Sequence, residues 1–304
     1  MNNISPIDGR YKENVSELEG YFSEQALMRY RIMVEVEYLL SLVELKSFHK
    51  KRSLSKKTLS SLRSLYTEFS DKDFKQIKKI ESKTNHDVNA VVVFISEKLE
   101  KISRRDLIPL VHFGLTSEDI NNTAYSLMTK GATKNIMVPA IKNVLKELKK
   151  LARRTKSLPM LSLTHGQPAT TTTLGKELAV FISRIERELV LISEINLLAK
   201  FSGATGSYAA HKAAFPAANW SVFAKKFIKR LGLGQSPITS QVEPGDSIAE
   251  LLHSYVRINN ILSDFSLDMW LYISRSIFVQ KNVSGEVGSS TVSYTHLTLP
   301  TKCS

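Results

Sequence analysis

The feature that most constrains the fold is a stretch near the end of the chain, residues 246–281, that contains neither proline nor glycine. Its apolar residues recur at helical steps over the whole stretch: Ile248, Leu251, Leu252, Tyr255, Val256, Ile258, Ile261, Leu262, Phe265, Met269, Ile273 and Ile277. At about 1.5 Å per residue such a helix is roughly 50 Å long, more than the width of a small domain. The stretch therefore predicts a helix that needs partners along its length.

Shorter segments repeat the helical pattern. They cover residues 21–48, 54–69, 87–102, 117–129, 139–155, 174–201 and 219–231. No stretch alternates with period two for long, although residues 237–242 are compatible with a short extended piece. The 304 residues include only 13 Gly and 9 Pro, too few for the many turns of a sandwich or barrel. We predict an all-α protein built around a long helix bundle, without internal repeats.

The charge balance and the cysteine content limit the environment and the partners. A formal net charge of +13 suits nucleic acid, an anionic membrane surface or a small polyanionic metabolite, and charge alone does not choose among them. The single cysteine, Cys303, excludes an internal disulfide and fits a reducing cytosol. The first residues lack the apolar region of a secretory signal, and the most apolar run, residues 90–95, is far shorter than a membrane span. We expect a cytoplasmic protein.

Polar and glycine-rich segments collect between the expected helices. They are TNHD at 84–87, HFGLTSED at 112–119, THGQP at 164–168, and the glycine-rich residues 202–207 and 285–290. Each one alone is as typical of a helix cap or a turn as of a binding site. Because five such segments occur in one helical chain, we expect them to share a function.

These segments resemble a known family. The residues that carry the likeness are SPIDGRY at 5–11, TNHDV at 84–88, HFGLTSEDINN at 112–122, THGQPAT at 164–170, GKE at 175–177, QVEP at 241–244 and GEVGSST at 285–291. Together they resemble the bacterial-type adenylosuccinate lyase family of the aspartase/fumarase superfamily. The resemblance runs from about Ser5 to Thr291 and implies that superfamily's all-α fold with a long central helix bundle.

The resemblance also implies a reaction. It is the β-elimination of fumarate from adenylosuccinate to give AMP, and from succinylaminoimidazole-carboxamide ribotide, with no cofactor and no metal. Such chemistry needs a base, an acid for the departing nitrogen and donors for the enolate-like charge. By similarity His165 is the general acid and Ser289 the base, with Ser290 as the alternative. A serine acts as a base only if cations or aligned N–H groups favour its alkoxide.

The family's binding residues are matched by eight positions here. They are Arg10 and Tyr11 for phosphate, Asn85, His86 and Asp87 as a second binding group, Thr116 and Ser117 for a succinyl carboxylate, and Gln241 for an amide contact. N–H groups at a helix start would favour an anion at Thr116 and Ser117 through the helix dipole. The family further implies a homotetramer with an anionic nucleotide substrate, and neither nucleic acid nor membrane as a partner.

Two departures from the family pattern affect the expected organisation. Residues 292–304 do not continue the loop that follows Thr291 in the family, so we assign no catalytic role to His296 or Cys303. Gly245 stands where bacterial-type relatives carry histidine. We expect an N-terminal helical domain over residues 1–110, an incomplete central bundle over 111–291 and a non-family tail over 292–304, with the C-terminal portion of the fold missing.

Two other functions remain open. One is a different fumarate-releasing lyase of the same superfamily. The other is a basic helical binding protein without catalysis, which would cluster Lys and Arg on one face with interleaved aromatic residues. The aromatic residues of this chain fall on apolar helix faces instead. The pattern thus favours the enzyme.

Overall fold

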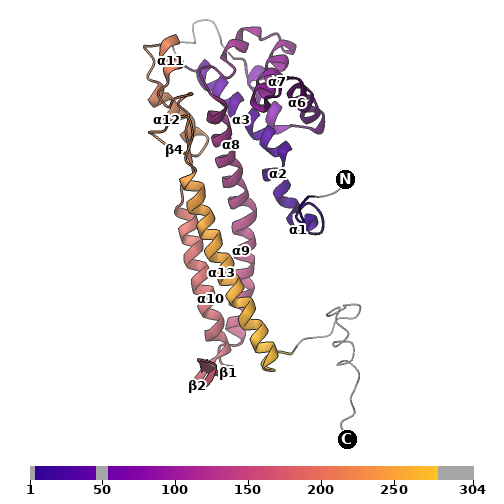
Figure 1. The fold of residues 1–304 in the computed structure, drawn as a ribbon, viewed down its shortest axis with the longest axis vertical. Helices are drawn as coiled ribbons and strands as arrows, with labels where there is room; N and C mark the ends of the chain where they lie inside the picture. The colour runs from indigo at the N-terminus through magenta and orange to yellow at the C-terminus, as the bar shows by residue number, and fades with distance from the viewer. Residues whose placement is uncertain (1–3, 46–53, 280–304) are drawn as a thin grey trace. The chain divides into compact units, whose positions relative to one another are not determined.

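The computed structural model describes residues 4–45 and 54–279 of the chain. It divides into two compact units, residues 1–257 and 258–304. Figure 1 shows that the described part of the first unit is built almost entirely from helices, which confirms the all-α prediction. No helix among the described residues is both long enough and apolar enough to cross a membrane.

The first part of the chain folds into short helices around one buried helix. In order they are α1 (Lys12–Val15), η1 (Ser16–Leu18), α2 (Glu19–Phe22), α3 (Glu24–Val43), α5 (Lys56–Thr67), α6 (Asp71–Thr84), α7 (Asp87–Lys101) and η2 (Arg105–Leu110). Ser23 begins α3 by accepting a hydrogen bond from the backbone N–H of Ala26 at 3.1 Å. Ser70 and Asp73 form a capping box at the start of α6. The helical periodicity did not indicate helix α6.

The second part contains the long helices and four short strands. In order they are α8 (Ser117–Ala132), the π-helical turn η3 (Thr133–Met137), α9 (Val138–Arg154), β1 (Pro159–Thr164), β2 (Gln167–Thr173), α10 (Leu174–Glu194), β3 (Leu198–Ala199), α11 (Ala209–Ala214), α12 (Trp220–Arg230), β4 (Gly234–Gln235) and α13 (Asp246–Ser274). Helices α8, η3 and α9 follow one another as a single rod, beside which α10 returns in the opposite direction (Figure 1).

Charged pairs join the long helices at their edges. Lys149 of α9 lies 2.5 Å from Glu186 of α10, and Arg257 of α13 lies 2.8 Å from Glu188 of α10. Glu188 is buried, so its pairing with Arg257 satisfies a charge that would otherwise be costly to bury. The first turns of α13 are thus fixed against α10 within the first unit.

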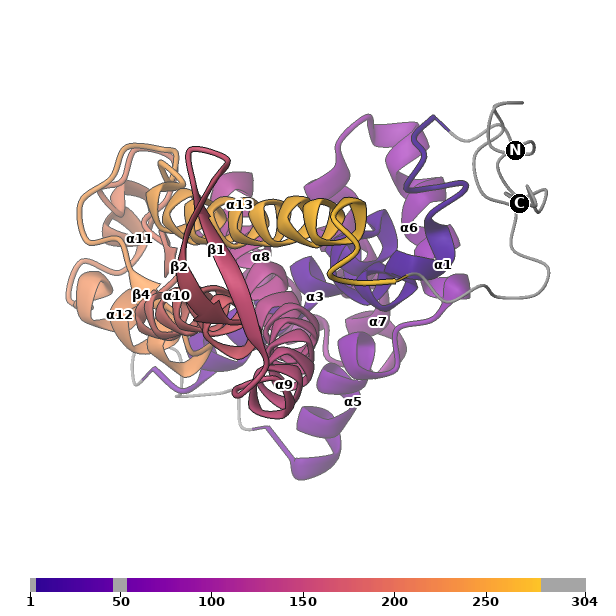
Figure 2. The same cartoon turned by 90° about the horizontal axis from the view of Figure 1, so that it is seen from below.

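Two local expectations about extended structure were wrong. Strands β1 and β2 form an antiparallel hairpin where the sequence indicated only a loop, and residues 237–242 form no strand. The hairpin was not predicted because its alternation is too short: Leu161 and Leu163 alternate with Ser162 and Thr164 in β1, whereas β2 has no such pattern, and most residues of both strands are exposed. Figure 2, seen from below, shows this hairpin in front of the ends of α9 and α10.

The helix expected over residues 174–201 ends early, at Glu194. The next residue, Ile195, is already extended, and residues 198–199 pair in parallel with residues 234–235. Leu197, Ala199 and Phe201 are buried in this extended segment. Burial on both sides of an extended chain gives a short apolar run that a helical period also fits.

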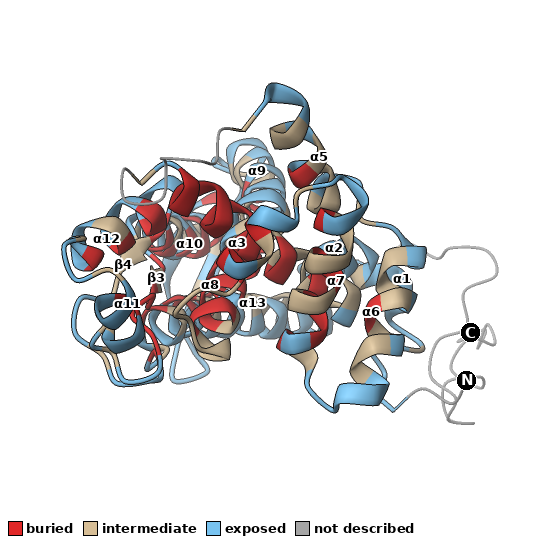
Figure 3. Ribbon diagram, turned by 90° about the horizontal axis from the view of Figure 1, so that it is seen from above, coloured by how far each residue is buried: buried red, intermediate tan, exposed pale blue. Residues whose placement is uncertain are grey.

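The core of the first unit surrounds α3 and the start of α8. Figure 3 shows the buried residues concentrated on α3, α7 and α8. An aromatic cluster joins α3 to the segment after β3 and to α12: the ring of Tyr38 lies 4.9 Å from that of Phe201, which lies 4.7 Å from that of Phe227. These buried rings pack directly before the glycine-rich loop at residues 202–207.

The described part of the second unit consists of the distal half of α13 and a short turn up to Val279. Its exposed side chains include Leu267, Trp270 and Leu271. This unit also contains Ser289 and Ser290, which lie outside the described residues.

Candidate active site

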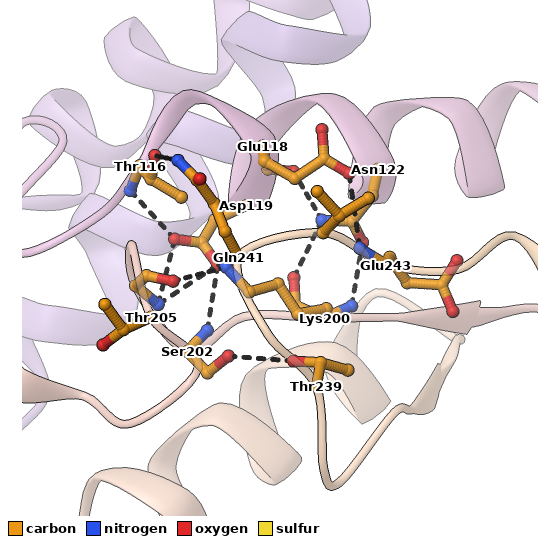
Figure 4. Close-up of polar contacts among 12 residues, drawn as sticks. Thr116, Glu118, Asp119, Asn122, Lys200, Ser202, Thr205, Thr239, Gln241 and Glu243 are labelled. Atoms are coloured by element: carbon orange, nitrogen blue, oxygen red, sulfur yellow. Dashed lines mark hydrogen bonds and ion pairs between the residues drawn. The ribbon is translucent and has the colours of Figure 1, made fainter.

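The start of α8 is organised by a buried ion pair. Asp119 and Lys200 are both fully buried, with the Lys200 Nζ 2.8 Å from Oδ1 of Asp119. The Asp119 carboxylate also accepts hydrogen bonds from the backbone N–H groups of Thr116 at 2.9 Å, Ser202 at 2.9 Å and Gly203 at 3.1 Å. Lys200 in turn donates to the carbonyl of Gly203 at 2.5 Å. Figure 4 shows how these contacts bind the start of α8 to the glycine-rich loop at residues 202–207.

A second set of bonds fixes α8 against the chain beside it. The Asn122 side chain donates to the carbonyl of Lys200 at 3.0 Å and accepts from its N–H at 2.8 Å (Figure 4). One turn further along, the Ser126 hydroxyl donates to the carbonyl of Leu198 at 2.6 Å. The extended segment around Lys200 therefore pairs with polar side chains of a helix, which supplies partners for its buried backbone groups.

Two of the predicted binding residues meet at this helix start. The Gln241 amide donates to the Thr116 hydroxyl at 3.4 Å, and the N–H of Glu243 donates to the Glu118 carboxylate at 3.5 Å. Ser117 is the first residue of α8, directly beside this contact. Burial raises the pKa of Glu118, more than the N–H of Glu243 and the charge of Lys200 lower it. Thr116 and Ser117, which are half-buried, thus form one group with the exposed Gln241 at the positive end of a helix.

His112, in the loop before α8, is held by a buried carboxylate. Its Nδ1 lies 2.5 Å from Oε1 of Glu35, and its backbone N–H donates to Oε2 at 3.2 Å. Burial alone lowers the pKa of His112, but the hydrogen bond and negative charge of Glu35 outweigh it and the pKa is raised. His112 also has a backbone φ of 57°, so the carboxylate holds a residue in a sparsely populated conformation.

The predicted group at 85–87 sits at the junction of α6 and α7 and has local partners. Asn85 ends α6 in the left-handed conformation, and Nδ1 of His86 accepts the N–H of Asn89 at 3.2 Å as the cap of α7. Asp87 pairs with the buried Arg31 at 2.6 Å, whose Nε donates to Asn121 of α8 at 2.9 Å. Burial raises the pKa of Asp87, but Arg31 and a backbone N–H outweigh it and lower the pKa. Arg31 thereby connects this group to α8.

Other predicted residues lie apart from this group. Arg10 and Tyr11 belong to an exposed turn near the start of the chain, where the guanidinium lies 5.6 Å from the Tyr11 ring centre. His165 is exposed at the tip of the β1–β2 hairpin with a φ of 53°. Figure 1 shows this tip at the opposite end of α9 and α10 from the start of α8. Within one chain, the structure does not bring His165 to Thr116.

The residues that organise the site most strongly were not among the predicted ones. Asp119 and His112 lie inside the motif at 112–122, but sequence patterns assigned no role to them. Lys200 and Glu35 lie in stretches for which the sequence indicated helices with one apolar face. A lysine or glutamate at a position otherwise occupied by apolar residues is a signal that a buried pair exists, although not of its partner. The described residues contain no group of three His, Cys, Asp or Glu side chains placed to hold a metal ion.

Removing the charge of Asp119 tests the central pair. In Asp119→Asn the ammonium of Lys200 remains buried without a counter-charge, so we expect the free energy of unfolding to fall by about 3–5 kcal/mol. Glu44→Gln is the matched control, because it removes an exposed partner of Arg230 and should cost about 1 kcal/mol or less. Urea denaturation measures both. Equal losses in the two variants would contradict the assigned role.

The His112–Glu35 pair predicts a pH dependence of stability. Because the pKa of His112 is higher in the folded than in the unfolded chain, its stabilising contribution is complete below the unfolded value of about 6.5 and is lost as the pH rises through the folded value. We expect Glu35→Gln to lower the free energy of unfolding more at about pH 6 than at about pH 9. Urea denaturation at both pH values checks this, and an equal loss at the two would refute it.

Comparisons with known proteins identify relatives of this chain. A family model described as lyase matches residues 9–292. The adenylosuccinate lyase of Dictyostelium discoideum is 45% identical over 296 residues, which cover 95% of this chain and 64% of the relative. The adenylosuccinate lyase of Escherichia coli strain K12 is 41% identical over 290 residues, with the same two coverages. The chain thus spans about 64% of the length of these curated relatives.

Solved structures show the same fold. The fumarate lyase from Mesorhizobium sp. BNC1 superimposes with a TM-score of 0.70 at 21% identity, over 85% of this chain and 57% of that one. The β-carboxy-cis,cis-muconate cycloisomerase from Acinetobacter calcoaceticus sp. ADP1 superimposes with a TM-score of 0.69 at 22% identity, with the same coverages. With the family model matching most of its residues and the helical fold shared with these enzymes, the chain belongs to the lyase family of the aspartase/fumarase superfamily.

Proposed function

We propose that this chain carries a large part of the active site of an adenylosuccinate lyase. The reaction is the elimination of fumarate from adenylosuccinate to give AMP, and from succinylaminoimidazole-carboxamide ribotide, in purine synthesis. The observation that carries the proposal is the contact between Gln241 and Thr116 at the start of α8. These residues are 125 positions apart, and the resemblance matches both to substrate contacts. The 38–45% identity to curated adenylosuccinate lyases supports the same reaction.

The chemistry at this helix start follows from its electrostatics. A succinyl carboxylate is attracted by the positive end of α8, where Ser117 and Thr116 offer polar groups. In the proposed reaction Ser289, or alternatively Ser290, removes a proton from the carbon next to a carboxylate. The C–N bond then breaks, and His165 donates a proton to the departing nitrogen. Fumarate and the nucleotide leave. The serine then loses the proton that it removed and His165 regains one, both by exchange with water.

The position of His165 requires a second chain for this reaction. Helix α10 begins directly after the hairpin and ends shortly before the Lys200 segment. Its 21 residues span about 30 Å at the usual helical rise. A proton cannot be donated over such a distance, so His165 and Thr116 of one chain serve different substrates. We propose that the hairpin of one subunit reaches the helix start of another in a homotetramer.

The remaining binding residues fit the same proposal. Arg10, with Tyr11 beside it, is suited to a phosphate because a guanidinium offers several N–H donors. The side chain of His86, whose Nδ1 caps α7, is 53% exposed and thus accessible to a ligand. The division into domains over residues 1–110 and 111–291 and a cytoplasmic location, favoured by the single cysteine, belong to the same proposal.

Loss of the acid or the base should slow the reaction without preventing binding. The assay uses the chain continued past Thr291 with the matching part of the Dictyostelium discoideum relative. We expect His165→Ala and Ser289→Ala each to lower kcat about 10²–10⁴-fold with adenylosuccinate as substrate, followed by ultraviolet absorption. Argininosuccinate serves as the comparison substrate. Faster release of fumarate from argininosuccinate, or an unchanged kcat in His165→Ala, would overturn the assignment.

Mixing variants tests the shared site. His165→Ala and Gln241→Ala chains are denatured together and refolded, so that each site draws its His165 and its Gln241 from different subunits. Random assembly then restores about a quarter of the sites. A chain carrying both substitutions, refolded alone, is the control and should stay inactive. Failure of the mixture to gain activity over its parents would contradict the shared site.

A further inference from the structure

His211 is buried between the two loops that form the candidate site. It lies in α11 and is 1% exposed. Its ring faces Gly114 of the loop before α8: a Cβ on Gly114 would lie only 2.8 Å from Cδ2 of His211. On the other side, a Cβ on Gly203 would lie 3.2 Å from the Gly114 carbonyl and 3.8 Å from Nδ1 of His211. The two loops therefore pack against each other and against one imidazole.

The hydrogen bonds define the tautomer of His211. The Tyr38 hydroxyl donates to the carbonyl of Phe113 at 2.7 Å, which uses its one proton. Nε2 of His211 lies 3.0 Å from the same hydroxyl, so Nε2 carries the hydrogen and donates it to the Tyr38 oxygen. Nδ1 is then a bare acceptor, and among the described residues it has no hydrogen-bond partner.

The surroundings keep this imidazole neutral. Burial lowers the pKa of His211 to about 4, while the negative charge of Asp119 and the positive charge of Lys200 act in opposite directions. Two further titratable groups face the ring, the Tyr38 hydroxyl at 3.0 Å from Nε2 and Tyr208, whose ring lies 6.0 Å away. A proton added to Nδ1 would be buried without an acceptor. The ring also packs at 4.7 Å against Trp220, which fixes its plane from the side of α12.

We propose that His211 is a positioning residue that holds the loop at 112–116 and the loop at 202–207 together as a neutral Nε2–H imidazole. The bond through Tyr38 to Phe113 fixes the first loop, and contact with Gly203 fixes the second. Thr116 and the Asp119 network lie at the ends of these loops. The benefit to substrate binding rests on the proposed function, whereas the restraint on the loops does not.

Two substitutions of His211 that differ by one methylene distinguish the effect of the hydrogen bond to Tyr38 from the effect of filling the space. The amide nitrogen of His211→Gln can take the place of Nε2 and donate to Tyr38, whereas that of His211→Asn is too short and reaches only the Nδ1 position. His253→Gln, an exposed substitution on α13, is the control. Hydrogen exchange of the 304-residue chain at about pH 7 measures residues 112–117, residues 202–207 and, as a gauge of global folding, α7.

We expect His211→Asn to speed exchange in both loops at least about tenfold, and His211→Gln and His253→Gln to stay within about threefold of the parent, with α7 unchanged in all three. In the parent chain, ¹⁵N-histidine NMR should show the Nε2–H form of His211 without protonation between about pH 5 and pH 8. The resonance is identified by its absence in His211→Gln.

Unchanged loops in His211→Asn, equal loosening by Gln and Asn, or titration of His211 near its ordinary pKa would each overturn the proposal. None of these measurements needs substrate. Loops that loosen as expected in a chain for which adenylosuccinate proves not to be the substrate would support the positioning role and refute the proposed function alone.

Discussion

The site depends on one buried charge pair, Asp119 with Lys200. Two ions inside a protein are tolerated only when each is matched by an opposite charge and by hydrogen bonds. Asp119 satisfies this condition with three backbone N–H groups as well as the ammonium, and each N–H comes from a part of the chain that must be held near the start of α8. The hydrogen bonds to this one carboxylate therefore hold the start of α8 next to the beginning of the glycine-rich loop.

The motifs are ambiguous as sequences because the same residues can cap a helix or bind a ligand. Asn85 and His86 end one helix and begin the next, and Thr116 begins α8, so each has a structural use that is independent of any ligand. The N–H groups of a helix start that a capping side chain satisfies are also the donors that bind an anion there. Capping and binding are therefore alternatives for a motif in isolation, and only the meeting of distant motifs separates them. Gln241 against Thr116 is such a meeting.

The long helices impose the other constraint. They separate the hairpin tip, in which His165 lies, from the loops at the opposite end. Helix α10 is rigid over its 21 residues, so loop motion does not close such a gap. In the proposed enzyme, association of chains would bring the two sites together, and it would also cover exposed apolar side chains of α10 such as Val180 and Val190.

The sequence by itself determined most of the long helices and the motifs, because a helical period and a helix cap are local properties of the chain. The starts of α7, α8, α10 and α13 were predicted to the residue for this reason. Tertiary structure alone decided the rest. The hairpin at 159–173 carries an alternation of only a few residues in β1 and none in β2, too little to indicate strands. The segment around Lys200 is extended because it pairs with α8 and β4, which are far away in sequence. Likewise, Lys200 and Asp119, or Glu35 and His112, have no local signature that names the partner. A buried charge is stable only opposite its counter-charge, and folding alone brings the two together.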